Sequence, residues 1–193
     1  VLARVMPVAL LWVGGQMLAP PHCQCRQGSK FPSLTPDQFL HLSNFVDQVK
    51  DGGYIVSGLT FSNDGNVTGN HGGDDIWIVK INSAGAITWQ KTLGGTGDED
   101  AGAIWEAFDG GFIIAGNSTS NDGDVSGNHG LDDIWVAKLS SAGSLIWQHS
   151  YGGTGFDDII DDPASAGMQQ TFDSGIILAG WTTSNDGDVT RNK

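Results

Sequence analysis

Hydrophobic and polar residues alternate in short runs through residues 43–193, and no long stretch shows the 3.6-residue apolar period of an amphipathic helix. Runs at 103–108 and 112–116 flank the turn Asp109-Gly110-Gly111, which favours a β-hairpin. Two further runs, at 133–139 and 145–151, are separated by a Ser-Ala-Gly turn. The pattern therefore predicts a unit of four short antiparallel strands.

This pattern occurs more than once along the chain. The segment Asp51-Gly52-Gly53-Tyr54 returns 58 residues later as Asp109-Gly110-Gly111-Phe112, and a third copy begins at Asp173, 64 residues after Asp109. Repeats at such a period indicate modules that bury their apolar faces against one another. The first two units should match strand for strand, with the paired ranges 54–60 and 112–118, 76–81 and 134–139, and 87–93 and 145–151.

Four antiparallel strands per repeat predict an all-β fold of β-propeller-type repeats. We expect an incomplete array of about two and a half four-stranded blades, since a closed propeller needs at least four. The expected boundaries are a candidate signal or leader segment at 1–30, a linker at 31–42, blade 1 at 43–97, blade 2 at 98–155 and partial blade 3 at 156–193. An apolar blade face and an open sheet edge should then be covered by self-association or by the remaining blades of a longer chain.

Net charge, cysteine positions and the N-terminal apolar run limit which partners and which cellular location we expect. The net charge of −13 disfavours nucleic acid as a partner, because phosphate backbones would be repelled. Both cysteines, Cys23 and Cys25, precede the repeats, so the fold does not depend on disulfides. The apolar run at 5–13 follows Arg4, resembles a secretory signal, and is too short for a transmembrane span. The alternative is an N-terminal segment of 30 residues that is irrelevant to the fold.

Several repeated motifs together are similar to those of a known group. Asp-Gly-Gly-Tyr/Phe-Ile, Ser-Asn-Asp-Gly-Asp-Val-x-Gly-Asn-His-Gly, Asp-Asp-Ile-Trp and Gly-Gly-Thr-Gly recur in order across residues 43–193. They resemble the repeats of bacterial secreted and cell-surface β-propeller proteins, which often carry a C-terminal sorting domain for type IX secretion. The resemblance implies a bacterial extracellular or cell-surface location and leaves the activity open, because most such proteins have no established activity.

The polar loop of each repeat is the best candidate for a site. It gathers Asp and Asn side chains between glycines, which is the oxygen chemistry that Ca²⁺ prefers. The candidate calcium ligands are Asp64, Asn66, Asp74, Asp122, Asp124, Asp132, Asp186 and Asp188. The spacing does not match an EF-hand loop. The alternative is that Asn-Asp-Gly is turn chemistry alone.

Other recurring residues are better explained by the scaffold. The Gly-Gly-Thr-Gly segments before Glu99 and Asp157 are expected to be turns between blades. His71 and His129 occupy equivalent loop positions and should make hydrogen bonds within the loop. Four tryptophans also recur in register and are expected in the blade cores. They are Trp77, Trp89, Trp135 and Trp147.

No catalytic constellation is evident from the residue pattern. The candidates that break the repeat symmetry contain no nucleophile–base pair; they are Trp105, Glu106, His149 and Trp181. We therefore expect a non-enzymatic extracellular scaffold that binds glycans or surface proteins through equivalent loops, with Ca²⁺ as the only cofactor considered. The alternatives are a fragment of a propeller-type glycan hydrolase or lyase, and a structural spacer without a ligand.

Overall fold

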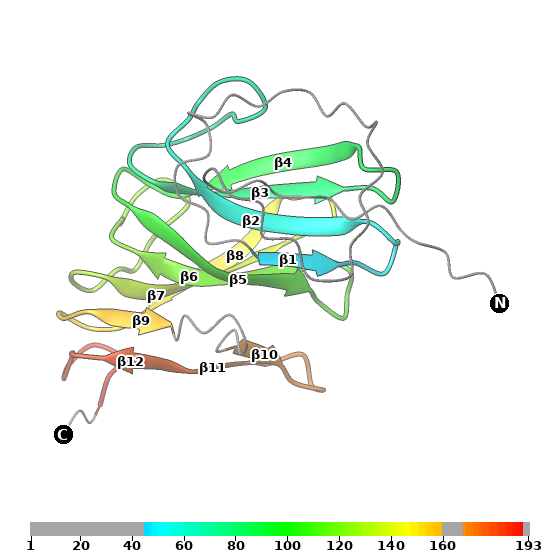
Figure 1. Cartoon of the computed structure of the whole chain (residues 1–193). Helices are drawn as coiled ribbons and strands as arrows, with labels where there is room; N and C mark the ends of the chain where they lie inside the picture. Colours follow the sequence, from blue (N-terminus) through cyan, green and yellow to red (C-terminus); the bar gives the residue numbers. More distant parts are fainter. Residues whose placement is uncertain (1–44, 160–167, 191–193) are drawn as a thin grey trace, which may run out of the picture.

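The computed structural model describes residues 45–159 and 168–190. Within these ranges the protein is all-β, with antiparallel strand pairs in every sheet and no helix. Two four-stranded sheets lie in successive layers, and a smaller layer follows them (Figure 1). No helix in the described ranges is long and apolar enough to cross a membrane. The expected leader, the linker and both cysteines lie outside the described residues.

The two large sheets have the same order and register. Sheet 1 contains β1 (Phe45–Gln48), β2 (Tyr54–Thr60), β3 (Asp75–Ile81) and β4 (Ile87–Leu93), and sheet 2 contains β5 (Glu99–Glu106), β6 (Phe112–Ser118), β7 (Asp133–Leu139) and β8 (Leu145–Tyr151). Tyr54 faces Ile81 in the first unit, as Phe112 faces Leu139 in the second. The predicted strands are confirmed, and β3 and β7 each begin one residue earlier than expected.

In the described ranges the third unit consists of two small two-stranded sheets. It contains β9 (Asp157–Ile159), β10 (Met168–Gln170), β11 (Ile176–Leu178) and β12 (Gly180–Thr182). β9 pairs with β12, and β10 pairs with β11, so the unit corresponds to the β5–β6 pair of sheet 2. The extra residues of the third copy fall between β9 and β10.

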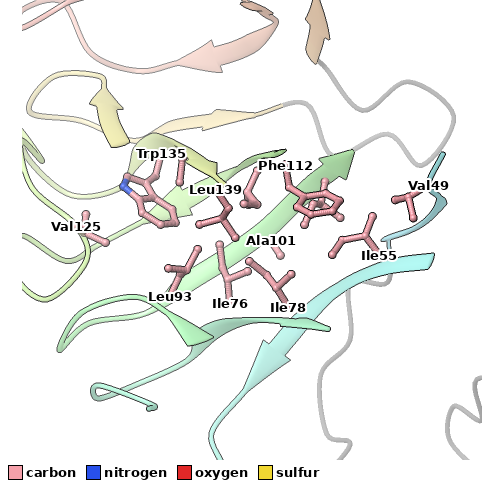
Figure 2. Packing of buried hydrophobic residues seen from close by; sticks show 13 residues of the cluster. Val49, Ile55, Ile76, Ile78, Leu93, Ala101, Phe112, Val125, Trp135 and Leu139 are labelled. Carbon is pink, nitrogen blue, oxygen red and sulfur yellow. The ribbon is translucent and has the colours of Figure 1, made fainter. Parts of the chain in front are cut away.

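Neighbouring layers pack against both faces of sheet 2. On one face Phe112, Trp135 and Leu139 pack with Ile76 and Leu93 of sheet 1 in a continuous core (Figure 2). On the other face a second core joins sheet 2 to the third unit, and it contains Ile113, Ala115, Val136 and Ile159, with Ile176 and Leu178 packed against them. Every residue of β6 is therefore buried, which explains its near-continuous apolar run.

In each of the two four-stranded units, a lysine of the third strand bonds the aspartate in the turn between the first two strands. Lys80 Nζ lies 2.7 Å from Asp51 Oδ2, and Lys138 Nζ lies 2.6 Å from Asp109 Oδ1. Asp109 also accepts a hydrogen bond from the Gly111 N–H at 2.9 Å. These contacts hold the pKa of Asp51 and of Asp109 below the usual range, chiefly through the lysine hydrogen bond. The lysine near the end of each Asp-Asp-Ile-Trp strand thus has a structural role.

The same turn provides a reciprocal test of backbone strain. Gly110 has φ +81° and open space where a Cβ would lie, whereas the equivalent residue of the third unit, Ser174, has φ +71°. A left-handed backbone conformation costs a residue other than glycine about 1–2 kcal/mol. This cost exceeds the stabilisation that replacing glycine gives by reducing the conformational entropy of the unfolded chain. We expect Gly110→Ser to lower the free energy of unfolding by roughly 1 kcal/mol and Ser174→Gly to raise it slightly. Urea unfolding of both variants checks this, and two shifts of the same sign would contradict it.

Candidate functional site: the junctions between repeats

An Asp of the second and of the third polar loop binds the Gly-Gly-Thr-Gly segment of the preceding repeat. Asp122 accepts hydrogen bonds from the Thr96 N–H at 2.8 Å and the Thr96 hydroxyl at 2.9 Å. Asp186 accepts the same pair from Thr154, again at 2.8 and 2.9 Å. We call each of these pairs an Asp–Thr clamp. The clamp lowers the pKa of both aspartates, with the backbone hydrogen bond as the main cause.

Backbone contacts repeat at the two junctions as closely as the clamps do. The Asp124 N–H donates to the Gly94 carbonyl, and the Asp188 N–H donates to the Gly152 carbonyl, both at 2.8 Å. A further pair of hydrogen bonds is also equivalent. The Gly97 N–H donates to the Ser120 hydroxyl at the first junction, and the Gly155 N–H donates to the Ser184 hydroxyl at the second. The polar loops of successive repeats are therefore fixed at the same end of the sheets in the same orientation.

At each junction, two buried carboxyl groups lie against the first glycine of the Gly-Gly-Thr-Gly segment. Glu99 accepts hydrogen bonds from the Gly95 N–H at 2.8 Å and the Ser118 hydroxyl at 2.5 Å. Asp75 lies on the other side of Gly94, where a Cβ would collide with both carboxyl groups. Burial raises the pKa of Glu99 and of Asp75. The Gly-Gly-Thr-Gly segment is thus a turn between repeats, as predicted, and its glycine makes room for the carboxyl pair.

The second junction keeps this arrangement with Asp157 in place of Glu99. Asp157 accepts hydrogen bonds from the Gly153 N–H and the Ser184 hydroxyl, both at 2.7 Å. Asp133 lies across Gly152 from it. The side chain of residue 157 is one methylene shorter than that of Glu99, yet it reaches the same two kinds of donor.

The recurring histidines connect the loops to the buried aspartates. His71 Nδ1 lies 2.8 Å from Asp75 Oδ2, and His129 Nδ1 lies 2.7 Å from Asp133 Oδ2. The hydrogen bond to Asp133 is the main cause that raises the pKa of His129. His71 Nε2 is also 3.9 Å from Asp124 of the next repeat. These contacts confirm the prediction that the histidines act as hydrogen-bonding residues of the loop.

The eight predicted calcium ligands are distributed over three loops. Asp122 and Asp186 use both carboxylate oxygens in the clamps, and Asp124 lies 3.5 Å from Lys91 Nζ. Asp74 donates its N–H to Asp98 at 3.1 Å, whereas Asp64, Asn66 and Asp188 are exposed. Among the residues described, no group of three or more His, Cys, Asp or Glu side chains is placed to hold a metal ion. Calcium binding by this set stays a prediction.

Asp132 has the most perturbed carboxyl group at the junctions. Burial raises its pKa to about 6, and the charges of Asp158, Asp100, Asp133 and Glu99 add to the shift. Its carbonyl also accepts the Asp157 N–H at 2.7 Å. The sequence marked Asp132 as one of eight candidate calcium ligands and did not show this cluster, because the recurrence of acids gives no information about which of them converge.

The tryptophans differ in burial although they recur in register. Trp135 is fully buried, which confirms a core role, and Trp89 is half-buried against Phe112 and the Ser141 carbonyl of sheet 2. The prediction that Trp147 is a core residue is wrong, because its side chain is 36% exposed. Trp147 is equivalent to Trp89 but is not covered by a further four-stranded sheet in the described ranges.

The candidates that break the repeat symmetry lie on three different strands, with Trp105 and Glu106 on β5, His149 on β8 and Trp181 on β12. Glu106 accepts a hydrogen bond from the Lys50 N–H at 2.7 Å and joins sheet 2 to sheet 1. His149 lies between Trp147 and Tyr151 on β8, with ring centroids 5.7 and 6.1 Å away. Trp181 is half exposed on β12.

Comparison with known proteins adds no relative, since no family model and no curated protein matches the chain.

Proposed function

We propose that the protein is a non-enzymatic, extracellular β-propeller-type repeat scaffold that binds glycans or surface proteins through equivalent loops. The observation that carries this proposal is the recurrence of the junction, with the same Asp–Thr clamp at Asp122 and Asp186. Equivalent junctions hold the second and third polar loops at the same end of the sheets and in the same orientation. Such an array favours multivalent binding, in which weak contacts add up.

The binding proposal predicts a strong dependence on valency. The whole chain should be retained weakly on immobilised bacterial or host glycans as single copies, and much more strongly when four copies are displayed on streptavidin, by about 10²–10⁴-fold. Asn66→Ala and Asp188→Ala change exposed loop positions and should reduce retention. Ser83→Ala, in the exposed β3–β4 turn at the other end of sheet 1, is the control. Equal retention of all variants, or no effect of valency, would contradict the proposal.

Calcium would act in this scaffold as a stabiliser of the loops. At a hundredfold excess over Kd, one native-state site raises the free energy of unfolding by about 2.7 kcal/mol. We expect millimolar Ca²⁺ to raise the melting temperature by several degrees relative to chelator, in the affinity range of extracellular modules. Identical melting curves with Ca²⁺ and chelator would exclude the calcium sites.

The Asp122→Asn variant distinguishes the stabilising effect of the clamp from that of calcium binding. Because Asp122 holds Thr96 through both oxygens, this variant should melt lower even in chelator. If Asp122 is also a ligand, the difference between Ca²⁺ and chelator should shrink in the variant. Glu106→Gln, outside the loops, should leave that difference unchanged.

One observation favours the alternative of a glycan hydrolase or lyase. A carboxyl group with a pKa near 6 beside other carboxylates, as at Asp132, suits a general acid. Incubation of the whole chain with polysaccharides, followed by a reducing-end assay, tests this function. Release of new ends that is lost in Asp132→Asn would favour the enzyme over the scaffold.

A further inference from the structure

The first polar loop contains a modification motif in addition to its acidic residues. Asn66-Val67-Thr68 has the form Asn-x-Ser/Thr, with x other than proline, which is the acceptor sequence for N-linked glycosylation. The same form occurs once more in the chain, at Asn117-Ser118-Thr119. Because so short a motif also arises by chance, the surroundings of each asparagine decide whether it can be modified.

Asn117 lies inside the fold, on β6 of sheet 2, and is only 8% exposed. Its Oδ1 accepts a hydrogen bond from the Ile159 N–H at 3.1 Å, and its Nδ2 donates to Asp158 Oδ1. The amide nitrogen that would carry a glycan is therefore engaged between sheet 2 and β9. A sugar cannot be attached there without separating the two layers, so the structure excludes the second motif.

Asn66 has the opposite surroundings, in the loop that joins β2 to β3 beyond the end of sheet 1 (Figure 1). The Val67 N–H donates to the Asp64 carbonyl at 2.9 Å and closes a turn in which Gly65 has φ +62°. Val67 is buried and anchors this turn, whereas Asn66 and Thr68 on either side of it are exposed. The first motif is therefore presented on the surface by a turn of defined shape.

The other two polar loops have the same turn without the acceptor. Asp124-Val125-Ser126 and Asp188-Val189-Thr190 match Asn66-Val67-Thr68 position for position, with Asp in place of Asn. The two valines close their turns as Val67 does, each donating its N–H at 3.0 Å to the carbonyl three residues before it. A change from Asp to Asn at one position of a common turn thus distinguishes the first loop as a glycan acceptor.

We propose that Asn66 accepts an N-linked glycan, which an oligosaccharyltransferase transfers to the exported chain; this inference rests on the extracellular location in the proposed function. In the transfer, Asn66 Nδ2 bonds to the anomeric carbon of a lipid-linked oligosaccharide diphosphate. The bond from that carbon to the diphosphate oxygen breaks, the lipid diphosphate leaves with the electron pair, and the amide nitrogen loses one proton. Asp64 supplies the acidic residue, two positions before the asparagine, that bacterial transferases of this class select.

Incubation of the whole folded chain with a purified bacterial oligosaccharyltransferase and a lipid-linked oligosaccharide tests the site. We expect the intact mass to rise by one glycan, and peptide mass spectrometry to place it on Asn66 and not on Asn117. A chain that stays unmodified, or that is modified at Asn117 instead, would overturn the proposal. The readout does not involve ligand binding by the loops, so the glycosylation site and the proposed binding function can fail separately.

Matched variants distinguish recognition of the motif from effects on folding. Asn66→Asp gives the first loop the residue that the other two loops have, so it should keep the fold and lose the glycan completely. Thr68→Ala should also lose the glycan, whereas Thr68→Ser should keep it. Asp188→Asn should add a second glycan, because Asp188 is exposed and Val189-Thr190 follow it. A glycan that persists in Asn66→Asp, or no second glycan in Asp188→Asn, would show that this turn does not select the acceptor, and the proposal would fail.

Discussion

Trp135→Ala should lower the free energy of unfolding by about 3–5 kcal/mol, the cost of removing a fully buried aromatic side chain. Trp135 is on β7, packs between sheets 1 and 2, and donates from Nε1 to Gln148 Oε1 at 2.7 Å. Its removal leaves a cavity in the core shared by two repeats and takes one hydrogen-bond donor from Gln148 Oε1. Urea unfolding followed by circular dichroism measures the change. Trp135→Phe should give a smaller loss and serves if the Ala variant does not fold.

Trp77→Ala is the matched control for this prediction. Trp77 occupies the same position of β3, and its Nε1 donates to Gln90 at 3.0 Å in the same way. It is only half-buried, because the alternation that turns Ile76 and Ile78 toward sheet 2 turns Trp77 away from it. The loss should therefore be less than half of that for Trp135→Ala. Equal losses would mean that the hydrogen bond, not packing between repeats, determines the stability.

The comparison of Trp77 with Trp135 also shows what the sequence can predict. Alternation and recurrence predicted the strands, because every β-strand imposes a period of two and every repeat imposes the same register. Burial within a repeat is decided by the neighbouring layer. Nearly identical local sequences therefore gave no means to distinguish Trp135, which packs against sheet 1 and is fully buried, from Trp77, which is only half-buried.

The turns and the polar surface of the loops could be predicted from the sequence, but the contacts between loops of different repeats could not. Their composition indicated turns and oxygen-rich surfaces, and the histidines were correctly predicted as hydrogen-bonding residues. The clamp from Asp122 to Thr96 joins residues 26 positions apart in different repeats, and no local pattern shows that contact. The convergence of Asp132 with Asp100 and Asp158 was hidden for the same reason.

Asp132→Asn should raise the free energy of unfolding near pH 7.5. Asp132 has a folded-state pKa of about 6 against an ordinary value of 3.8, because burial and four neighbouring acids disfavour its charge. The folded state therefore holds a proton that the unfolded state releases between these two values. Stability is lost as pH rises from about 3.8 to about 6, and the full penalty is present above that window. After allowance for solvent screening, the gain from the neutral amide is about 1–2 kcal/mol.

The pH dependence of this gain distinguishes charge repulsion from other effects of the substitution. Near pH 3.5 the carboxyl group of Asp132 in the folded protein is protonated and neutral, like the amide of the Asp132→Asn variant. The free energies of unfolding of the two proteins should therefore converge at this pH. Asp122→Asn is the control of opposite sign, because the Thr96 hydrogen bonds lower the pKa of Asp122 and its contribution is lost as pH falls. Urea unfolding at several pH values measures both variants. A gain for Asp132→Asn that does not change with pH would exclude the carboxyl cluster as its cause. A pH-dependent gain would show that the protein keeps a destabilising acid at this junction, which selection for stability alone would remove.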